Sequence, residues 1–103
     1  MIYSNFECYK KNKEGLKRKM SISFELDVLK PHQPNSSTLA RALKKIDEVK
    51  FVSVRVEEID QKTTSIIILI RGDEELLLEK IVEVLDSNNC ALHSVDEVTI
   101  EDE

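Results

Sequence analysis

The chain has 103 residues, of which 41% are hydrophobic and 34% are charged, and its formal net charge is −5. A chain of this length is expected to fold as one domain that buries only roughly 60 to 65% of its surface, so contacts with further copies would help to cover its core. No run of about 18 apolar residues is present, so we expect no transmembrane helix.

The charges are unevenly placed along the chain. Residues 1–20 hold six bases and two acids, whereas residues 21–103 hold nine bases and 18 acids, a formal −9. An acidic surface repels phosphate backbones, since affinity for nucleic acids depends mainly on Lys and Arg. We therefore expect neither nucleic acid nor a membrane as a partner. Divalent cations and basic surfaces fit this charge better.

The first 19 residues differ from the rest of the sequence. They have no apolar period and little to bury, so we expect residues 1–19 to be a disordered or non-native extension of a single domain at residues 20–103. No apolar stretch of the signal-peptide type follows the basic residues, which predicts a cytoplasmic protein.

The first half of the domain predicts a strand and a helix. Apolar and polar side chains alternate over Ser21–Leu29, which is typical of a half-buried strand, and Pro31 and Pro34 end it. Asn35 is a favourable N-cap for a helix over about Ser36–Asp47.

The second half predicts a hairpin, a helix and a last strand. Phe51–Ile59 alternates again, and a short polar turn connects it to the next strand. Asp73 is expected to cap a second helix, whose apolar stripe consists of Leu77, Leu78, Ile81, Val82 and Leu85. The last strand is expected over Cys90–Ile100, followed by a fraying acidic end at residues 101–103.

The most apolar stretch of the chain is Ile66–Ile70, five apolar residues in a row between Thr64 and Arg71. Successive side chains of a strand point to opposite faces, so this strand is apolar on both faces and should lie inside the sheet. One helix layer can cover only one face. We expect a copy of the same protein to cover the other.

The order of strand, helix, strand, strand, helix and strand predicts a ferredoxin-like α+β fold. In this βαββαβ arrangement, a four-stranded antiparallel sheet has both helices on one face. The first and third strands are central, which agrees with the apolar Ile66–Ile70 stretch. The other face of the sheet is left open.

Four strings of residues carry a resemblance to a known family: Asp27-Val28-Leu29-Lys30-Pro31-His32-x-Pro34, Val56-x-Glu58-Ile59-Asp60, Arg71-Gly72-Asp73 and Leu92-His93-Ser94-Val95-Asp96-Glu97-Val98. Over about Met20–Val98 the chain resembles a small archaeal family known only as the two-hundred-eleventh domain of unknown function. The resemblance implies a ferredoxin-like fold, a cytoplasmic location and homo-oligomers, with calcium an occasional companion in relatives. It implies no established activity. The chain departs from the family pattern in its long start and at Ser36, Ser37 and Glu48.

Several kinds of chemistry are excluded by the sequence. Gly15 and Gly72 are the only glycines, so no glycine-rich phosphate loop can be written. The two cysteines have no Cys-x-x-Cys spacing, so we expect neither a disulfide framework nor a cysteine zinc site. His93 and Ser94 are neighbours on a strand and point to opposite faces, so they cannot form a nucleophile and base pair. RNA-binding modules of this fold stack bases on aromatic side chains, which the central strands lack on the open face.

The best candidate site joins the first and last strands, which should run antiparallel side by side. This arrangement brings Glu25 and Asp27 near the last strand, and carboxylates with a nearby imidazole can bind a divalent cation such as calcium. The candidate metal ligands are Glu25, Asp27, His93, Asp96 and Glu97. The alternative is that the acids of the first strand are simply solvated or pair with Lys30, Arg55 or Arg71.

Two functions from different classes remain open. The first, which we favour, is a non-catalytic homo-oligomeric binding or scaffold protein, in which open faces or strand edges pack on copies and acidic residues at the contacts bind calcium. The second is a small-molecule sensor with an unknown ligand bound between subunits near Lys30–Pro34. We expect no enzymatic activity, because two histidines and no identifiable nucleophile leave only metal-assisted chemistry.

The sequence also predicts where translation begins. Lys13-Glu14-Gly15 can be encoded by a purine-rich run that resembles a ribosome-binding site, and Met20 follows shortly after it. We expect protein expressed from its own upstream sequence to begin at Met20, which intact mass spectrometry can measure. A mass that includes residues 1–19 would overturn this prediction.

Overall fold

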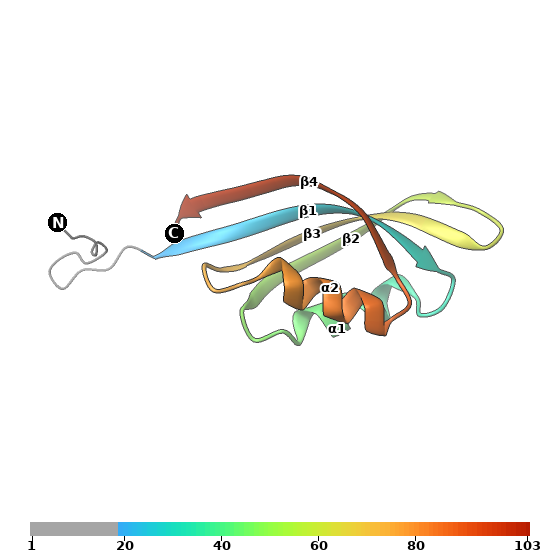
Figure 1. The fold of residues 1–103 in the computed structure, drawn as a ribbon, viewed down its shortest axis with the longest axis horizontal. Coiled ribbons are helices and arrows are strands. Elements are labelled where there is room, and N and C mark those ends of the chain that lie inside the picture. Colours follow the sequence, from blue (N-terminus) through green and yellow to red (C-terminus); the bar gives the residue numbers. More distant parts are fainter. Residues whose placement is uncertain (1–18) are drawn as a thin grey trace, which may run out of the picture.

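The computed structural model describes residues 19–103, so the prediction for residues 1–18 lies outside the described part of the chain. Six elements follow one another in the predicted βαββαβ order, and both helices lie on the same face of a four-stranded sheet (Figure 1). Their bounds are β1 Met20–Pro31, α1 Ser36–Lys44, β2 Val49–Ile59, β3 Thr63–Asp73, α2 Leu78–Ser87 and β4 Ala91–Asp102. The ferredoxin-like fold is therefore confirmed.

The sheet is antiparallel throughout, with the strand order β2-β3-β1-β4. The predicted inner position of β3 is confirmed, because it pairs with β1 on one side and with β2 on the other. The two edges of the sheet are therefore β2 and β4.

The core lies between the helices and one face of the sheet. Ile66, Ile68 and Ile70 of β3 are fully buried on this face, because Leu39 and Leu43 of α1 pack over the sheet together with residues of α2. Burying a side chain of this size stabilises the fold by roughly 1.5 to 3 kcal/mol. Only one face of the apolar strand gains this stabilisation within the chain.

Helix α1 begins as predicted and ends earlier than predicted. The Asn35 side chain accepts a hydrogen bond from the backbone N–H of Thr38 at 2.8 Å, which confirms the N-cap. The helix ends at Lys44 instead of Asp47, because the chain turns there: the N–H of Ile46 donates to Leu43 O at 3.2 Å, and that of Val49 to Ile46 O at 3.0 Å.

The predicted start of the second helix is wrong. Asp73 accepts from the N–H of Glu75 at 2.9 Å, but this bond closes a turn, and α2 begins only at Leu78. Leu76, 2% exposed, is the residue that enters the core, whereas Leu77 is 55% exposed and does not belong to the apolar stripe. Because of the turn between β3 and α2, Leu76 points into the core in place of the predicted Leu77.

The predicted fraying of the acidic end is also wrong. Strand β4 continues to Asp102, with Glu101 opposite Ser21 and Asp102 opposite Met20 of β1. The N–H of Glu103 then donates to Lys19 O at 2.9 Å. Pairing with β1 therefore orders these residues despite their charge. Within the described range, no helix is long and apolar enough to cross a membrane.

At Gly72, the backbone of β3 lies very close to the turn between α1 and β2. A Cβ atom at this position would overlap Glu48 O and would lie 2.9 Å from Leu76 Cδ2. The same carbonyl accepts a hydrogen bond from Asp73 N at 3.1 Å, so the contact fixes the start of β2 beside the end of β3. Only glycine leaves room for this approach.

We therefore expect Gly72→Ala to lower the free energy of unfolding by about 1 to 3 kcal/mol, because a backbone atom must move to admit the methyl group. Urea denaturation measures the change. Lys62→Ala, at an exposed turn position, is the control and should change the free energy by less than about 0.5 kcal/mol. An equally stable Gly72→Ala variant would contradict the close contact.

Candidate functional site

The face of the sheet opposite the helices is covered by no other element among the described residues (Figure 1). Ile67 and Leu69 of β3 lie at its centre, and neither is fully buried. In the register of the sheet, Leu69 is flanked by Ser53 and Glu25, and Ile67 by Arg55 and Asp27. The open face thus combines an apolar centre with charged neighbours.

Two of the predicted metal ligands lie opposite each other. Glu25 of β1 pairs with Glu97 of β4, so the side chains of these two acids share the open face. Asp27 lies opposite Ser94 in the same pair of strands. The expected proximity of the first strand to the last is confirmed.

The other two predicted ligands lie where β4 is irregular. The register shifts leave Asp96 and His93 as extra residues of β4, and both are exposed. The hydroxyl of Ser94 donates to Asp96 Oδ1 at 2.7 Å, and that of Thr99 donates to Glu97 Oε2 at 3.5 Å. The two acids of β4 are therefore oriented by neighbours on their own strand.

These positions form a pair of opposed carboxylates with further acids nearby, but not a closed metal site. Like charges directly opposite each other in a sheet are destabilising unless a cation neutralises them. Within residues 19–103, no three His, Cys, Asp or Glu side chains lie close enough together to hold a metal ion. The metal site stays a prediction, and it would need ligands from outside one chain.

The three cations named as alternative partners of these acids are engaged elsewhere. Arg55 Nε pairs with Glu57 at 3.0 Å. The Arg71 guanidinium lies 5.2 Å from the centre of the Phe51 ring. The Lys30 ammonium is held by backbone carbonyls. None of these contacts neutralises the opposed carboxylates.

Lys30 is a structural cation that the sequence reasoning missed. Its side chain is almost fully buried, and its Nζ donates to Pro31 O and Pro34 O at 2.8 Å each and to His32 O at 3.4 Å. The loop after β1 is thus wrapped around an ammonium group. A signal was available, because Lys30 continues the every-second-residue period of the buried side of β1.

His32 and Cys90 lie in the same region as Lys30. His32 Nε2 lies 3.0 Å from Asp60 O, which joins the loop to the β2–β3 hairpin. Burial raises the pKa of the Cys90 thiol, and the charge of Lys30 acts in the opposite direction. The prediction that Cys90 is a small buried hydrophobe is confirmed, since it is 4% exposed.

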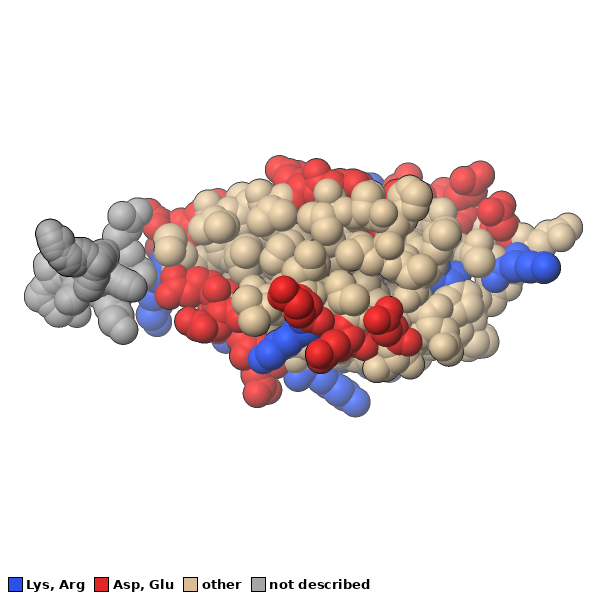
Figure 2. All heavy atoms as spheres, viewed as in Figure 1, with Lys and Arg blue, Asp and Glu red and all other residues tan. Residues whose placement is uncertain are grey.

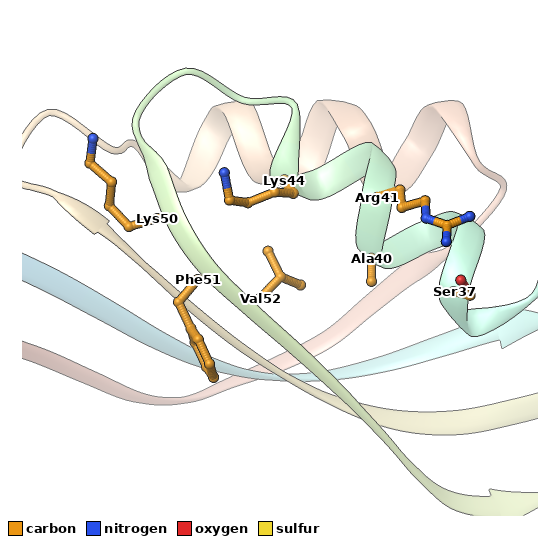
Figure 3. Close-up of a pocket in the computed structure, with 7 residues that line it drawn as sticks. All are labelled: Ser37, Ala40, Arg41, Lys44, Lys50, Phe51 and Val52. Atoms are coloured by element: carbon orange, nitrogen blue, oxygen red, sulfur yellow. The ribbon is translucent and has the colours of Figure 1, made fainter.

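A groove of about 400 Å³ lies between α1 and the edge strand β2, and the sequence reasoning did not find it. Its cations are Arg41 and Lys44 of α1 and Lys50 of β2 (Figure 3). Its other lining residues are Ser37, Ala40, Phe51 and Val52. Among the described residues none of the three cations makes an ion pair. Acidic side chains are visible along β4, and others lie over α2 and towards the ends of the sheet (Figure 2).

The comparisons with known proteins agree with the resemblance seen in the sequence. Residues 23–103 match the model of the family DUF211, described as "Uncharacterized ArCR". The uncharacterized protein MJ0319 of Methanocaldococcus jannaschii is 36% identical over 73 residues, which cover 71% of this chain and 74% of that protein. The crystal structure of a "Putative Antibiotic Biosythesis Monooxygenase" from Bacillus cereus covers 82% of this chain and 93% of its own, with 12% identity and a TM-score of 0.30.

The contacts of Lys30 lead to a test of the loop. Lys30→Met keeps most of the apolar stem but leaves three carbonyl groups without their charged donor, so we expect the free energy of unfolding to fall by about 1.5 to 3 kcal/mol. Urea denaturation measures the loss. Lys45→Met, at the exposed end of α1, is the control and should have almost no effect. Equal stabilities for the two variants would contradict a structural role for the Lys30 ammonium.

Proposed function

This chain belongs to DUF211, an uncharacterized archaeal family, and we propose that it is a non-catalytic, homo-oligomeric binding or scaffold protein of the cytoplasm. In this proposal, the sheet surfaces left uncovered in one chain pack on further copies. Calcium binds through the acidic residues at those contacts. The geometry of the uncovered sheet supports this function.

The observation that carries the proposal is the uncovered second face of β3. Ile67 and Leu69 lie at the centre of the sheet with no helix above them. Contact with a second copy would remove this apolar surface from water and would stabilise the assembly in proportion to the area buried. A chain this small gains more from such contact than a large domain would.

The acidic residues support the calcium part of the proposal. Calcium binds six to eight oxygen ligands, and opposed carboxylates are stabilised by a cation between them. Glu25 and Glu97 offer such a pair, with Asp27 and Asp96 on the same two strands. One chain supplies an incomplete ligand set, so the ion would bind where a second copy adds further oxygens.

The contact of His32 supports a protein without catalytic activity. His32, one of only two histidines, is bonded to the backbone carbonyl of Asp60, which is a structural contact.

The sensor hypothesis has weaker support. It relied on the segment Lys30–Pro34, whose single cation is already engaged by three carbonyl groups of that loop.

Light scattering of the full chain tests the proposal. We expect a mass of several chains, and we expect millimolar calcium to raise the mass or lower the concentration needed for assembly, compared with a chelator. Glu25→Gln and Glu97→Gln should each abolish the calcium effect, because each removes one charge of the opposed pair. Glu83→Gln, at an exposed position of α2, is the matched control.

A monomer with and without calcium would overturn the proposal. An oligomer of unchanged mass in calcium, with the same thermal stability in calcium and in chelator, would overturn its calcium part alone. In that case the apolar and edge surfaces would suffice for assembly.

A further inference from the structure

The two edge strands carry charges of opposite sign. The first part of β2 contains Lys50 and Arg55, whereas the second part of β4 contains Glu97, Glu101 and Asp102. Each edge strand has a partner on only one side among the described residues: β2 pairs with β3, and β4 with β1. In the order β2-β3-β1-β4, the strands alternate in direction. A copy placed beside the first therefore brings its β4 antiparallel to β2 and continues the same sheet.

Both edges contain a regular segment suited to such pairing. The bulges of β2 lie at Lys50 and Glu57, which leaves Phe51–Val56 regular, and those of β4 lie at His93 and Asp96, which leaves Glu97–Asp102 regular. Bulges limit unspecific edge pairing, so the remaining straight segments are where a specific partner strand can add.

The faces of the two segments restrict the register. On the helix side lie Val52 and Val54 of β2, which pair with core residues of β3. On the helix side of β4 lie Val98 and Ile100, which are 51% and 61% exposed. Because directly opposed residues of an antiparallel pair share a face, allowed registers differ by steps of two residues.

One of these registers matches both faces. With Arg55 opposite Glu97, a cation meets an acid on the open face. On the helix side, Val54 then lies opposite Val98, and Val52 opposite Ile100. The exposed apolar residues of β4 are covered by residues of the same kind.

This register also brings a positive charge to the opposed carboxylates. Glu97 lies opposite Glu25 within the chain, and both are on the open face. Arg55 is exposed and is held only by its neighbour Glu57 within the described range, with its side chain 68% accessible. An incoming guanidinium would give Glu97 a bidentate partner and reduce the repulsion from Glu25.

The groove beside β2 fits the end of β4. In the same register, the acidic residues 101–103 of β4 reach the start of β2, where Lys50 and the α1 cations Arg41 and Lys44 line the groove. Ala40 and Val52 are apolar residues of the groove (Figure 3), and in this register Ile100 of the neighbouring copy lies opposite Val52. The groove cations and the acidic end therefore complement each other.

We propose that β2 of one copy pairs antiparallel with β4 of the next, with Arg55 opposite Glu97 and the acidic end of β4 in the groove between α1 and β2. This inference rests on the proposed self-association and specifies its contact. Because the two surfaces differ, the contact repeats head to tail and produces a ring or a filament. Pairing of β4 with β4 would instead bring acid against acid.

Charge reversal across the two edges tests the pairing. Arg55→Glu faces Glu97 with a second acid, and Glu97→Arg faces Arg55 with a second cation, so each variant alone should raise the dissociation constant by at least about tenfold. Mixed in equal amounts, the two variants restore opposite charges at every contact. The mixture should regain the wild-type mass with the two chains alternating. Light scattering gives the mass, and native mass spectrometry with one variant labelled gives the proportion of the two chains, which should be equal if they alternate.

The measurements are made in chelator, so that calcium does not mask the charge effect, and circular dichroism checks that each variant is folded. Glu83→Arg on α2 is the control of equal charge change and should assemble like the wild type. Single variants that keep the wild-type mass would overturn the edge pairing while leaving the proposed function intact. Loss for Arg55→Glu alone, without rescue by mixing, would indicate pairing of β2 with β2 and would also overturn it. A wild type that is monomeric in chelator and oligomeric in calcium would overturn the edge pairing alone, and one that is monomeric in both would overturn both proposals.

Discussion

The structure depends on the fact that β3 has two apolar faces, whereas the helices cover only one of them. Strand β3 is apolar on both faces over Ile66–Ile70, but the two helices of the described residues both lie on the same side of the sheet. Ile66, Ile68 and Ile70 are completely buried, whereas Ile67 and Leu69 on the other side are not. The fold therefore uses half of its most apolar strand and leaves the other half for contact with something else.

The fold could be predicted from the sequence because its signals are local. Alternation in β1 and β2, the cap at Asn35 and the apolar run of β3 each determine one element, and the right-handed crossover rule then leaves few topologies. The errors arose where tertiary contacts decide. Asp73 resembles a helix cap, but the burial of Leu76 delays the start of α2, and pairing with β1 orders an acidic end that composition alone would leave frayed.

The candidate site was predictable only in part. The strand order predicted that Glu25 lies near the last strand, whereas its exact opposition to Glu97 depends on the register of β1 and β4. The positions of Asp96 and His93 depend on bulges, which no residue pattern in β4 predicts. No sequence pattern connects the cations Arg41, Lys44 and Lys50, and only the packing of α1 beside β2 brings them to one groove. Lys30 shows the converse case, since its position in the period of β1 already indicated burial.

The distribution of charge explains why a net value says little about assembly. The groove between α1 and β2 is lined by Arg41, Lys44 and Lys50, whereas the second half of β4 carries Glu97, Glu101 and Asp102, so an acidic protein can still attract copies of itself through short-range contacts of opposite sign. Glu97 links the two proposals, because both calcium and the Arg55 guanidinium of a neighbour would neutralise it. A carboxylate has two oxygens, so Glu97 can accept from the guanidinium of a neighbour at the edge and still share calcium with Glu25 on the open face. Edge pairing uses the outer backbone of β2 and β4, whereas face packing is centred on Ile67 and Leu69 of β3, so neither contact excludes the other.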